Sequence, residues 1–402
     1  MKSAFKRKVL KNGMTIIFEK RNLPVVSVAF AVRNGGINEK EEEKGISHFI
    51  EHMLYKGTPK RDAKKIADEI EKRGGDLNGF TSEEITAYWC KMPARHLNVA
   101  LEVLADMVKN PLFNEKELEK ERKVIFEEIK MYHDNPHMHS LDEIQKLLYN
   151  GTMQINLAGT FRTMNSITRK KILDSFKQIY TPNNMILCVV GNADFDYLLR
   201  FVEKNFKEGQ GKVPIAKFEL ENGSKIEERK GIDQANLIFA HHVPVAKDKK
   251  SSAAVVLNAL MAGGMSSRLF AEIREKRNLA YSVKGDANIN KNFAYNLIYV
   301  GTMKENIEKV KKLILEEFEK VANSLEEKEL NQIKEQLIGN YQISMEDSQQ
   351  QMINLLSYEI YENAKEFYNF EEDILKVKLE DVKNLASEAR KNYSFFALIP
   401  KE

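Results

Sequence analysis

The stretch His48-Phe49-Ile50-Glu51-His52 is the most informative part of the sequence. At about 100° per residue along a helix, its two histidines, its glutamate and Tyr55 share one face, and the remaining arc is apolar. Such a helix should be buried on its apolar side and should end near Gly57. Two imidazoles one turn apart can both reach one Zn²⁺ ion, and the neighbouring carboxylate can take a proton from a metal-bound water.

A third ligand is expected from a second predicted helix, Glu115 to Tyr132, whose start carries the capping residues Asn114 and Glu117. Glu121 and Glu128 fall on the apolar stripe of this helix, whereas its other charged residues are typical of a solvated face. A lone buried carboxylate is costly, and a metal ion or a metal-bound histidine would compensate it. The spacing alone leaves open which of the two glutamates binds the metal.

Length and composition indicate a globular chain of two domains. A chain of 402 residues is longer than one core usually supports. Of these residues, 43% are hydrophobic and 30% are charged, which is typical of a globular protein. The formal charge of +3 argues against a nucleic-acid partner. Cys90 and Cys188 lie in apolar stretches, so we expect buried free thiols. No apolar run is long enough for a membrane span, and the absence of a signal segment favours the cytoplasm.

The order of the predicted elements indicates an α+β fold. Helical patterns alternate irregularly with strand patterns at 15–19, 25–32 and 185–191. A polar, turn-rich segment between Lys207 and Lys230 predicts a linker, and a similar order of elements follows it. We therefore predict two similar domains, 1–212 with the zinc site and 213–402, each with a mainly antiparallel sheet covered by helices on one face.

These motifs resemble those of the M16 (pitrilysin-like) zinc peptidases, the inverzincins, and especially their processing-peptidase branch of similar chain length. In that family, the two histidines of H-x-x-E-H and a downstream glutamate bind zinc. The resemblance implies that His48, His52 and Glu128 bind one Zn²⁺ per chain and that Glu51 is the general base. It implies that Glu121 supports a ligand.

A further motif, Asn78-Gly79-Phe80-Thr81, resembles the N-A-x-T start of the family's active-site edge strand, with Gly79 in place of alanine. The resemblance implies that Asn78, Gly79 and Phe80 pair with the backbone of an extended substrate. Strand addition of this kind recognises backbone more than side chains. The sequence therefore predicts how a peptide binds without predicting its residues.

The second half carries Arg274-Glu275-Lys276-Arg277-Asn278-Leu279-Ala280-Tyr281-Ser282, which resembles the family stretch R-E-x-x-G-L-A-Y-S. Asn278 replaces the usual glycine and tolerates the same positive φ. From the residues alone, Arg274 would be an ordinary surface cation and Tyr281 a core aromatic. The resemblance instead implies that these two side chains hold the substrate carbonyl.

The activity implied by the resemblance is zinc-dependent hydrolysis of peptides or unfolded polypeptides inside a chamber, with Glu51 assisting the attack of zinc-bound water. Arg274 and Tyr281 would help to stabilise the oxyanion. One chain carries both the zinc motif and the Arg274/Tyr281 pair. The resemblance therefore implies a homodimer with composite sites, or a heterodimer with a paralogue. The alternatives are a non-catalytic partner subunit of an M16-type complex and a metal-dependent hydrolase of small molecules.

A second histidine cluster, made of His133, His137 and His139, surrounds Pro136. It could bind a metal ion. We favour a solvated loop after the Glu128 helix, because proline breaks any regular ligand spacing.

Overall fold

The computed structural model describes residues 4–401, which form two compact units. The first unit comprises the described residues up to Lys130, with Ile155–Lys217 and Ser344–Phe367; the second comprises Met131–Gln154, Phe218–Ile343 and the described residues from Tyr368 onward. Each unit has its own sheet and its own core of buried apolar side chains. The predicted α+β class with two similar domains is confirmed.

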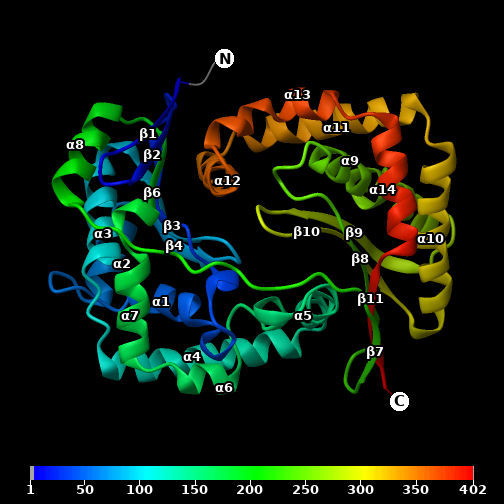
Figure 1. The fold of residues 1–402 in the computed structure, drawn as a ribbon, viewed down its shortest axis with the longest axis horizontal. Helices are drawn as coiled ribbons and strands as arrows, with labels where there is room; N and C mark the ends of the chain where they lie inside the picture. The colour runs from blue at the N-terminus through cyan, green and yellow to red at the C-terminus, as the bar shows by residue number, and fades with distance from the viewer. Residues whose placement is uncertain (1–3, 402) are drawn as a thin grey trace. The chain divides into compact units, whose positions relative to one another are not determined.

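A six-stranded sheet forms the centre of the first unit, in the order β1-β2-β6-β3-β5-β4 (Figure 1). Neighbouring strands are antiparallel except β2 and β6, which are parallel. Strand β4 lies at one edge. The strands are β1 (Ala4–Val9), β2 (Thr15–Lys20), β3 (Val25–Val32), β4 (Asp76–Thr81), β5 (Thr86–Pro93) and β6 (Met185–Gly191).

The second unit contains a five-stranded sheet in the order β7-β11-β8-β10-β9. Here too all neighbours are antiparallel except one pair, β7 and β11. The second sheet therefore repeats the first one without β1. The strands are β7 (Ser224–Arg229), β8 (Ala235–His242), β9 (Ala280–Ile289), β10 (Ala294–Thr302) and β11 (Ser394–Pro400).

Helices cover both sheets (Figure 1). Those of the first half of the chain are α1 (Ile46–Leu54), α2 (Ala63–Glu71), α3 (Leu97–Lys109), α4 (Glu115–Asp134), α5 (Pro136–Leu148), α6 (Phe161–Ser166), α7 (Arg169–Ile179) and α8 (Phe195–Asn205). Those of the second half are α9 (Ser251–Ala262), a π-helical turn (Phe270–Glu275), α10 (Ile307–Ser324), α11 (Glu327–Ser344), α12 (Ser348–Tyr361), α13 (Phe370–Leu375) and α14 (Leu379–Lys391). The helix predicted from Glu115 to Tyr132 is α4, which ends two residues later.

Helix α12 comes from the second half of the chain but packs on β3 and β6 in the first unit. Its first residue, Ser348, places its hydroxyl oxygen 2.9 Å from that of Ser27 on β3. Successive strand residues face opposite sides, so Ser27, Ala29 and Ala31 line this face while Val28 faces the main core. These small residues let the helix approach the sheet closely.

Helix α5 makes the reverse exchange: it comes from the first half and packs on β8 and β11 in the second unit. The ring of His139 on α5 lies against Phe396 of β11, with centroids 6.1 Å apart. The compact units therefore differ from the continuous segments 1–212 and 213–402, because each unit takes one helix from the other half. Both sheets are consequently covered on a second face as well.

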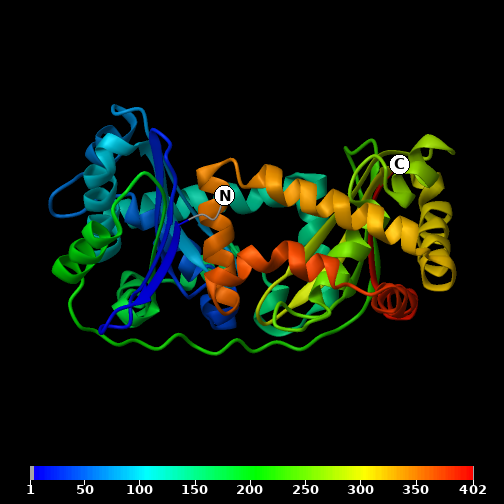
Figure 2. The ribbon, with the colours of Figure 1, turned by 90° about the horizontal axis from the view of Figure 1, so that it is seen from above.

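The segment between α8 and β7 has no helix or strand from residue 206 to residue 219. Figure 2 shows it in green as an extended chain. Part of it is held on the first unit, where the side-chain amide of Asn38 donates to the carbonyl of Pro214 (2.8 Å). This segment covers the first part of the predicted linker, 207–230, whose later residues 224–229 form β7 instead.

Candidate metal centre

The start of helix α1 is held by a buried carboxylate. Glu39 accepts hydrogen bonds from the backbone N–H groups of Gly45 (2.8 Å) and Ser47 (2.7 Å). Gly45 has φ 95°, which favours glycine, so the chain can turn sharply into the helix. Burial raises the pKa of Glu39 to about 7. Because carboxylates are favourable at helix N-termini, Glu39 fixes the position of the helix.

The two faces of α1 are as the sequence predicts. The apolar residues, all buried in the core of the first unit, are Phe49, Ile50, Met53 and Leu54. The helix ends at Leu54, and Gly57 with φ 123° lets the chain turn away. The opposite face carries His48, Glu51 and His52, which are half-buried.

The side chains of His48, His52 and Glu128 converge, with one possible ligand atom from each within 4.8 Å of the others. Nε2 of His48 and Nε2 of His52 each lie 3.6 Å from Oε2 of Glu128. These distances are too long for hydrogen bonds. They suit three donors around one ion, because ligands of a tetrahedral zinc lie roughly 3.4 Å apart. Two imidazoles and a carboxylate are also the donor set that a catalytic zinc prefers, so the residues fit this metal.

Glu121 lies behind His52 and fixes the orientation of its ring. His52 Nδ1 donates to Glu121 Oε2 (3.1 Å), and the ammonium group of Lys56 lies 2.7 Å from Glu121 Oε1. With Nδ1 used as the donor, Nε2 is the ring nitrogen that faces Glu128 and is left for a metal ion. Burial raises the pKa of Glu121, but the hydrogen bonds from His52 and Lys56 bring it below its ordinary value. Glu121 is therefore a carboxylate that holds His52, one of the candidate ligands.

The two histidines have opposite electrostatic environments. Burial, and then the neighbouring His52, lower the pKa of His48 to about 4. Burial also lowers the pKa of His52, but the hydrogen bond to Glu121 and the nearby charge of Glu128 outweigh it and bring the pKa to about 9. The carboxylates thus favour positive charge at this point of the fold, as a cation site requires.

Glu51 lies between the histidines in sequence and beside the edge strand in space. Its Oε2 accepts a hydrogen bond of 2.6 Å from the hydroxyl of Thr81, the last residue of β4. Burial raises the pKa of Glu51, although the bond from Thr81 opposes this. A half-buried carboxylate with a raised pKa is suited to proton transfer.

The predicted substrate strand is the edge strand β4, which pairs with β5 alone among the described strands. Asn78, Gly79 and Phe80 lie at its centre, and α1 packs against it. Asn78 is exposed, and Gly79 and Phe80 are half-buried. The structure therefore brings the predicted metal ligands, Glu51 and the predicted peptide strand together in one unit.

Arg274 and Tyr281 lie in the second unit, on the π-helical turn and on β9. The guanidinium of Arg274 stacks on Phe270, 4.8 Å from the ring centroid. Tyr281 is 74% exposed, which excludes the core aromatic that the bare sequence favours. Asn278 between them has φ 50°, as predicted for a residue that replaces glycine. Both side chains are thus presented to solvent as hydrogen-bond donors.

The histidine cluster around Pro136 is a junction of two helices, so the predicted solvated loop was wrong. Helix α4 continues to Asp134 and α5 starts at Pro136. The side-chain oxygen of Asn135 caps α5 by accepting from the N–H groups of His137 (3.1 Å) and Met138 (3.0 Å). Proline suits the first turn of a helix, because its missing N–H has no partner there in any case.

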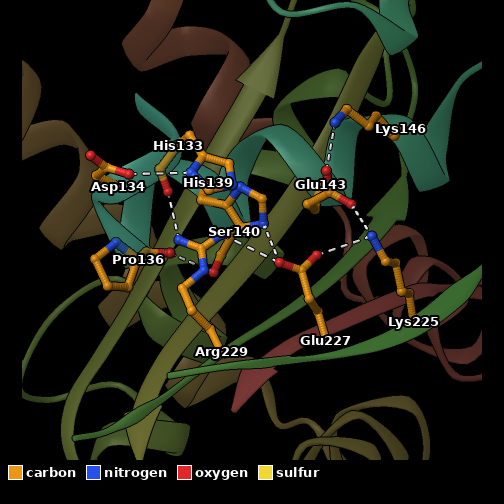
Figure 3. Close-up of polar contacts among 10 residues, drawn as sticks. All are labelled: His133, Asp134, Pro136, His139, Ser140, Glu143, Lys146, Lys225, Glu227 and Arg229. Atoms are coloured by element: carbon orange, nitrogen blue, oxygen red, sulfur yellow. Dashed lines mark hydrogen bonds and ion pairs between the residues drawn. The ribbon is translucent and has the colours of Figure 1, made fainter. Parts of the chain in front are cut away.

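His139 of this cluster joins a network of ion pairs between α5 and β7 (Figure 3). His139, Glu143 and Glu227 bring possible ligand atoms within 4.8 Å of one another. However, the ammonium group of Lys225 lies 2.5 Å from Glu143 and 3.1 Å from Glu227, and Lys146 lies 2.5 Å from Glu143. Protein cations already neutralise these carboxylates, so the network is better suited to holding α5 than to binding a metal.

Both halves match family models of the M16 peptidases. Residues 15–160 match the family described as Insulinase (Peptidase family M16), and residues 166–337 match the Peptidase M16 inactive domain. The chain therefore belongs to peptidase family M16. The first match contains the H-x-x-E-H helix and Glu128.

Curated relatives support this membership over most of the chain. An uncharacterized zinc protease of Bacillus subtilis, YmxG, is 35% identical over 353 residues, which is 86% of each chain. An uncharacterized zinc protease of Rickettsia felis is 31% identical over 417 residues, covering 99% of this chain and 98% of the relative.

Solved structures show the same fold. A protease from Helicobacter pylori superimposes with a TM-score of 0.91 at 23% identity, covering 99% of this chain and 100% of that one. A putative M16-like peptidase from Alicyclobacillus acidocaldarius gives 0.89 at 18% identity, with 100% and 99% covered. Within residues 4–401, no helix is both long and apolar enough to cross a membrane.

Sequence reasoning missed three residues that support the site. Thr81 belongs to the quoted edge-strand motif, but nothing in the motif predicts its bond to Glu51. Lys56 follows His52 by one helical turn, a spacing that could have indicated its contact with the same partner. Glu39 comes from a turn-rich segment whose path no periodic pattern predicts.

Proposed function

We propose that this protein is a zinc-dependent endopeptidase that hydrolyses peptides or unfolded polypeptides. The observation that carries the proposal is the convergence of His48, His52 and Glu128 within 4.8 Å, on the helix that also carries Glu51. Relatives named as zinc proteases support the choice of metal. One zinc ion per chain, held by these three residues, would supply a Lewis acid beside Glu51.

Glu51 is the proposed general base and, later, the general acid. It takes a proton from the attacking water and returns it to the leaving amine. The bond from Thr81 holds Oε2, so Oε1 is the oxygen left to exchange the proton. Burial favours this role because it raises the pKa of Glu51 toward neutrality.

Strand β4 is the proposed docking strand for the substrate. One edge of β4 pairs with β5, so its other edge can pair with an extended peptide. Asn78, Gly79 and Phe80 would align the peptide backbone beside Glu51. Because a folded protein rarely offers a free extended segment, this mode favours short or unfolded substrates.

Arg274 and Tyr281 are the proposed donors to the substrate carbonyl. Both are exposed, and neither is needed to complete the core of the second unit. Following the family resemblance, we further propose a chamber and a homodimer in which each site is composite, with a heterodimer with a paralogue as the alternative. The buried free thiols Cys90 and Cys188 suit a reducing compartment such as the cytoplasm.

A non-catalytic role is the second candidate, because residues 166–337 match a model described as an inactive domain. Metal analysis and a peptide-library digest of the wild type and of Glu51→Gln would separate the two. We expect one zinc per chain in both proteins and cleavage by the wild type alone. Zinc binding without cleavage by the wild type would favour the partner subunit, and equal cleavage by both proteins would refute the role of Glu51.

A further inference from the structure

Tyr55 ends the polar face of α1 with a hydroxyl that the proposed mechanism does not use. It follows the last residue of the helix, and its ring packs beside Tyr88 with centroids 6.1 Å apart. The hydroxyl oxygen is buried and has no hydrogen-bond partner among the described residues. Buried polar groups are nearly always paired, so this donor requires an explanation.

The hydroxyl points at the centre of the proposed docking strand. A Cβ atom added to Gly79 would lie 2.6 Å from the Tyr55 oxygen and 2.9 Å from the carbonyl oxygen of Ala87. The first distance is far below any real contact of a Cβ atom. The Tyr55 hydroxyl therefore occupies the space in which an alanine at position 79, the residue of the motif quoted above, would place its methyl group.

The same space borders Glu51. The added Cβ atom on Gly79 would lie 3.3 Å from Glu51 Oε1, the oxygen that Thr81 leaves open. The hydroxyl and the carboxylate oxygen thus both border this one point. Burial, and then the charge of Glu51, raise the pKa of Tyr55 well above 10, so the hydroxyl keeps its proton and can act as a donor.

We propose that Tyr55 is a positioning residue for Glu51. Its hydroxyl donates a hydrogen bond to one lone pair of Glu51 Oε1 when metal and substrate are bound, which leaves the other lone pair to exchange the proton. Gly79, which has no Cβ atom, leaves the space for this hydroxyl. This inference rests on the proposed function, in which Glu51 moves the proton. Thr81 and Tyr55 would then hold the carboxylate from both of its oxygens. A base held in this way needs less reorganisation during the reaction.

The test is a double-mutant cycle of Tyr55→Phe and Gly79→Ala, first in zinc-free protein after chelation. Gly79→Ala should lower the melting temperature by several degrees, and adding Tyr55→Phe should restore part of this loss because the hydroxyl is then gone, while the carbonyl oxygen of Ala87 still lies close to the new methyl group. Tyr55→Phe alone should leave the melting temperature almost unchanged, since its hydroxyl has no partner in this state. Additive losses would show that the two side chains do not share space and would overturn the proposal.

The zinc-loaded enzyme provides the second measurement, on a peptide that the wild type cleaves. Tyr55→Phe should lower kcat about tenfold with little change in KM or zinc content, as expected for one lost hydrogen bond to a charged group. Tyr180→Phe is the matched control, because its buried hydroxyl pairs with Tyr88 (2.6 Å). The control should lower the melting temperature and leave kcat unchanged.

Two failures can be told apart. If the wild type cleaves and Tyr55→Phe keeps its full kcat, the positioning role is wrong while the peptidase function stands. If the wild type binds zinc and cleaves nothing, the proposed function fails and takes the role of Tyr55 with it. The melting cycle still decides whether Tyr55 and Gly79 share space.

Discussion

The two halves of the chain build the same sheet but place different side chains in the segment that precedes the edge strand. The strand order β2-β6-β3-β5-β4 of the first unit recurs as β7-β11-β8-β10-β9 in the second, with the one parallel pair at the same place. Between β3 and β4 lies α1, with its histidines. Between β8 and β9 lie α9 and the π-helical turn, which contain no histidine.

The two segments also differ in burial. Helix α9 is buried along most of its length, including Asn258, whose side-chain amide donates to the carbonyls of Asp286 (3.0 Å) and Leu297 (3.2 Å). Helix α1 keeps a half-buried polar face instead. The comparison teaches that the sheet and its core are common to both halves, whereas the polar face of α1 is an addition to this frame. Its carboxylates and imidazoles are costly to bury unless they have a ligand or one another as partners.

Removing one carboxylate from each of the two possible ligand groups, His48/His52/Glu128 and His139/Glu143/Glu227, should separate the two units most sharply. Glu128→Ala should weaken zinc binding by more than the roughly 100-fold that loss of a supporting hydrogen bond costs, because a ligand itself is lost. Glu143→Ala should leave zinc stoichiometry unchanged, because its group is neutralised by lysines. Zinc competition with a chromophoric chelator measures both. Loss of zinc from Glu143→Ala would contradict our assignment.

The exchanged helices allow a second comparison. Glu359 on α12 is fully buried and pairs with Arg7 (2.7 Å) and Arg33 (2.6 Å). Glu359→Gln should destabilise the first unit by about 3 kcal/mol, since two buried ion pairs lose their acceptor charge. Hydrogen exchange should rise in β3 and β6 and stay unchanged in β8 and β11.

The matched change in the second unit is Glu143→Gln on α5. Its partners, Lys146 and Lys225, are half exposed, so we expect a loss of only about 1 kcal/mol. Hydrogen exchange should now rise in β8 and β11. Equal exchange in both sheets for either variant would mean that the units unfold together rather than separately.

The carboxylate behind His52 should affect zinc binding less than the ligand Glu128 does. Glu121→Gln should lower zinc affinity about 10- to 100-fold, because His52 loses the acceptor that fixes its ring. Glu127→Gln on the same helix is the control, since Glu127 is exposed and pairs with Lys130 (2.7 Å). Isothermal titration with zinc measures both, and equal affinities would remove Glu121 from the site.

The smallest expected effect is the pH dependence of the second unit. Burial lowers the pKa of His241 on β8 to about 4. The unfolded chain therefore binds a proton near pH 6.5 while the folded chain does not, so stability is present above pH 6.5 and is lost as the pH falls toward 4. Between pH 7 and 5.5 the loss should be about 1 kcal/mol. Urea unfolding of His241→Gln should lack this component, and an unchanged pH dependence would exclude His241 as its source.

Much of the candidate site follows from local sequence patterns. The helical period places His48, Glu51 and His52 on one face, and the same period places Glu121 and Glu128 on the stripe of α4. Both arrangements depend only on residues within one helix. The positive φ of Asn278 was also predictable, because few residues other than asparagine replace glycine there.

What could not be predicted depends on contacts between distant segments. Periodicity indicates that α5 and α12 each bury a face, but it cannot indicate which sheet receives that face. Pro136 suggested a loop because proline disrupts helix interiors, although here it starts a helix. The bond between Thr81 and Glu51 joins a strand to a helix, and no spacing along the chain encodes it.

The reciprocal exchange of α5 and α12 interlocks the two halves of the polypeptide. A half expressed by itself would leave one apolar sheet surface open to water and carry one helix with nothing to cover. A protease cut within residues 206–219, by contrast, should yield two fragments that stay together until denatured. The two similar units thus depend on each other for completion, even though the candidate metal ligands lie in one of them.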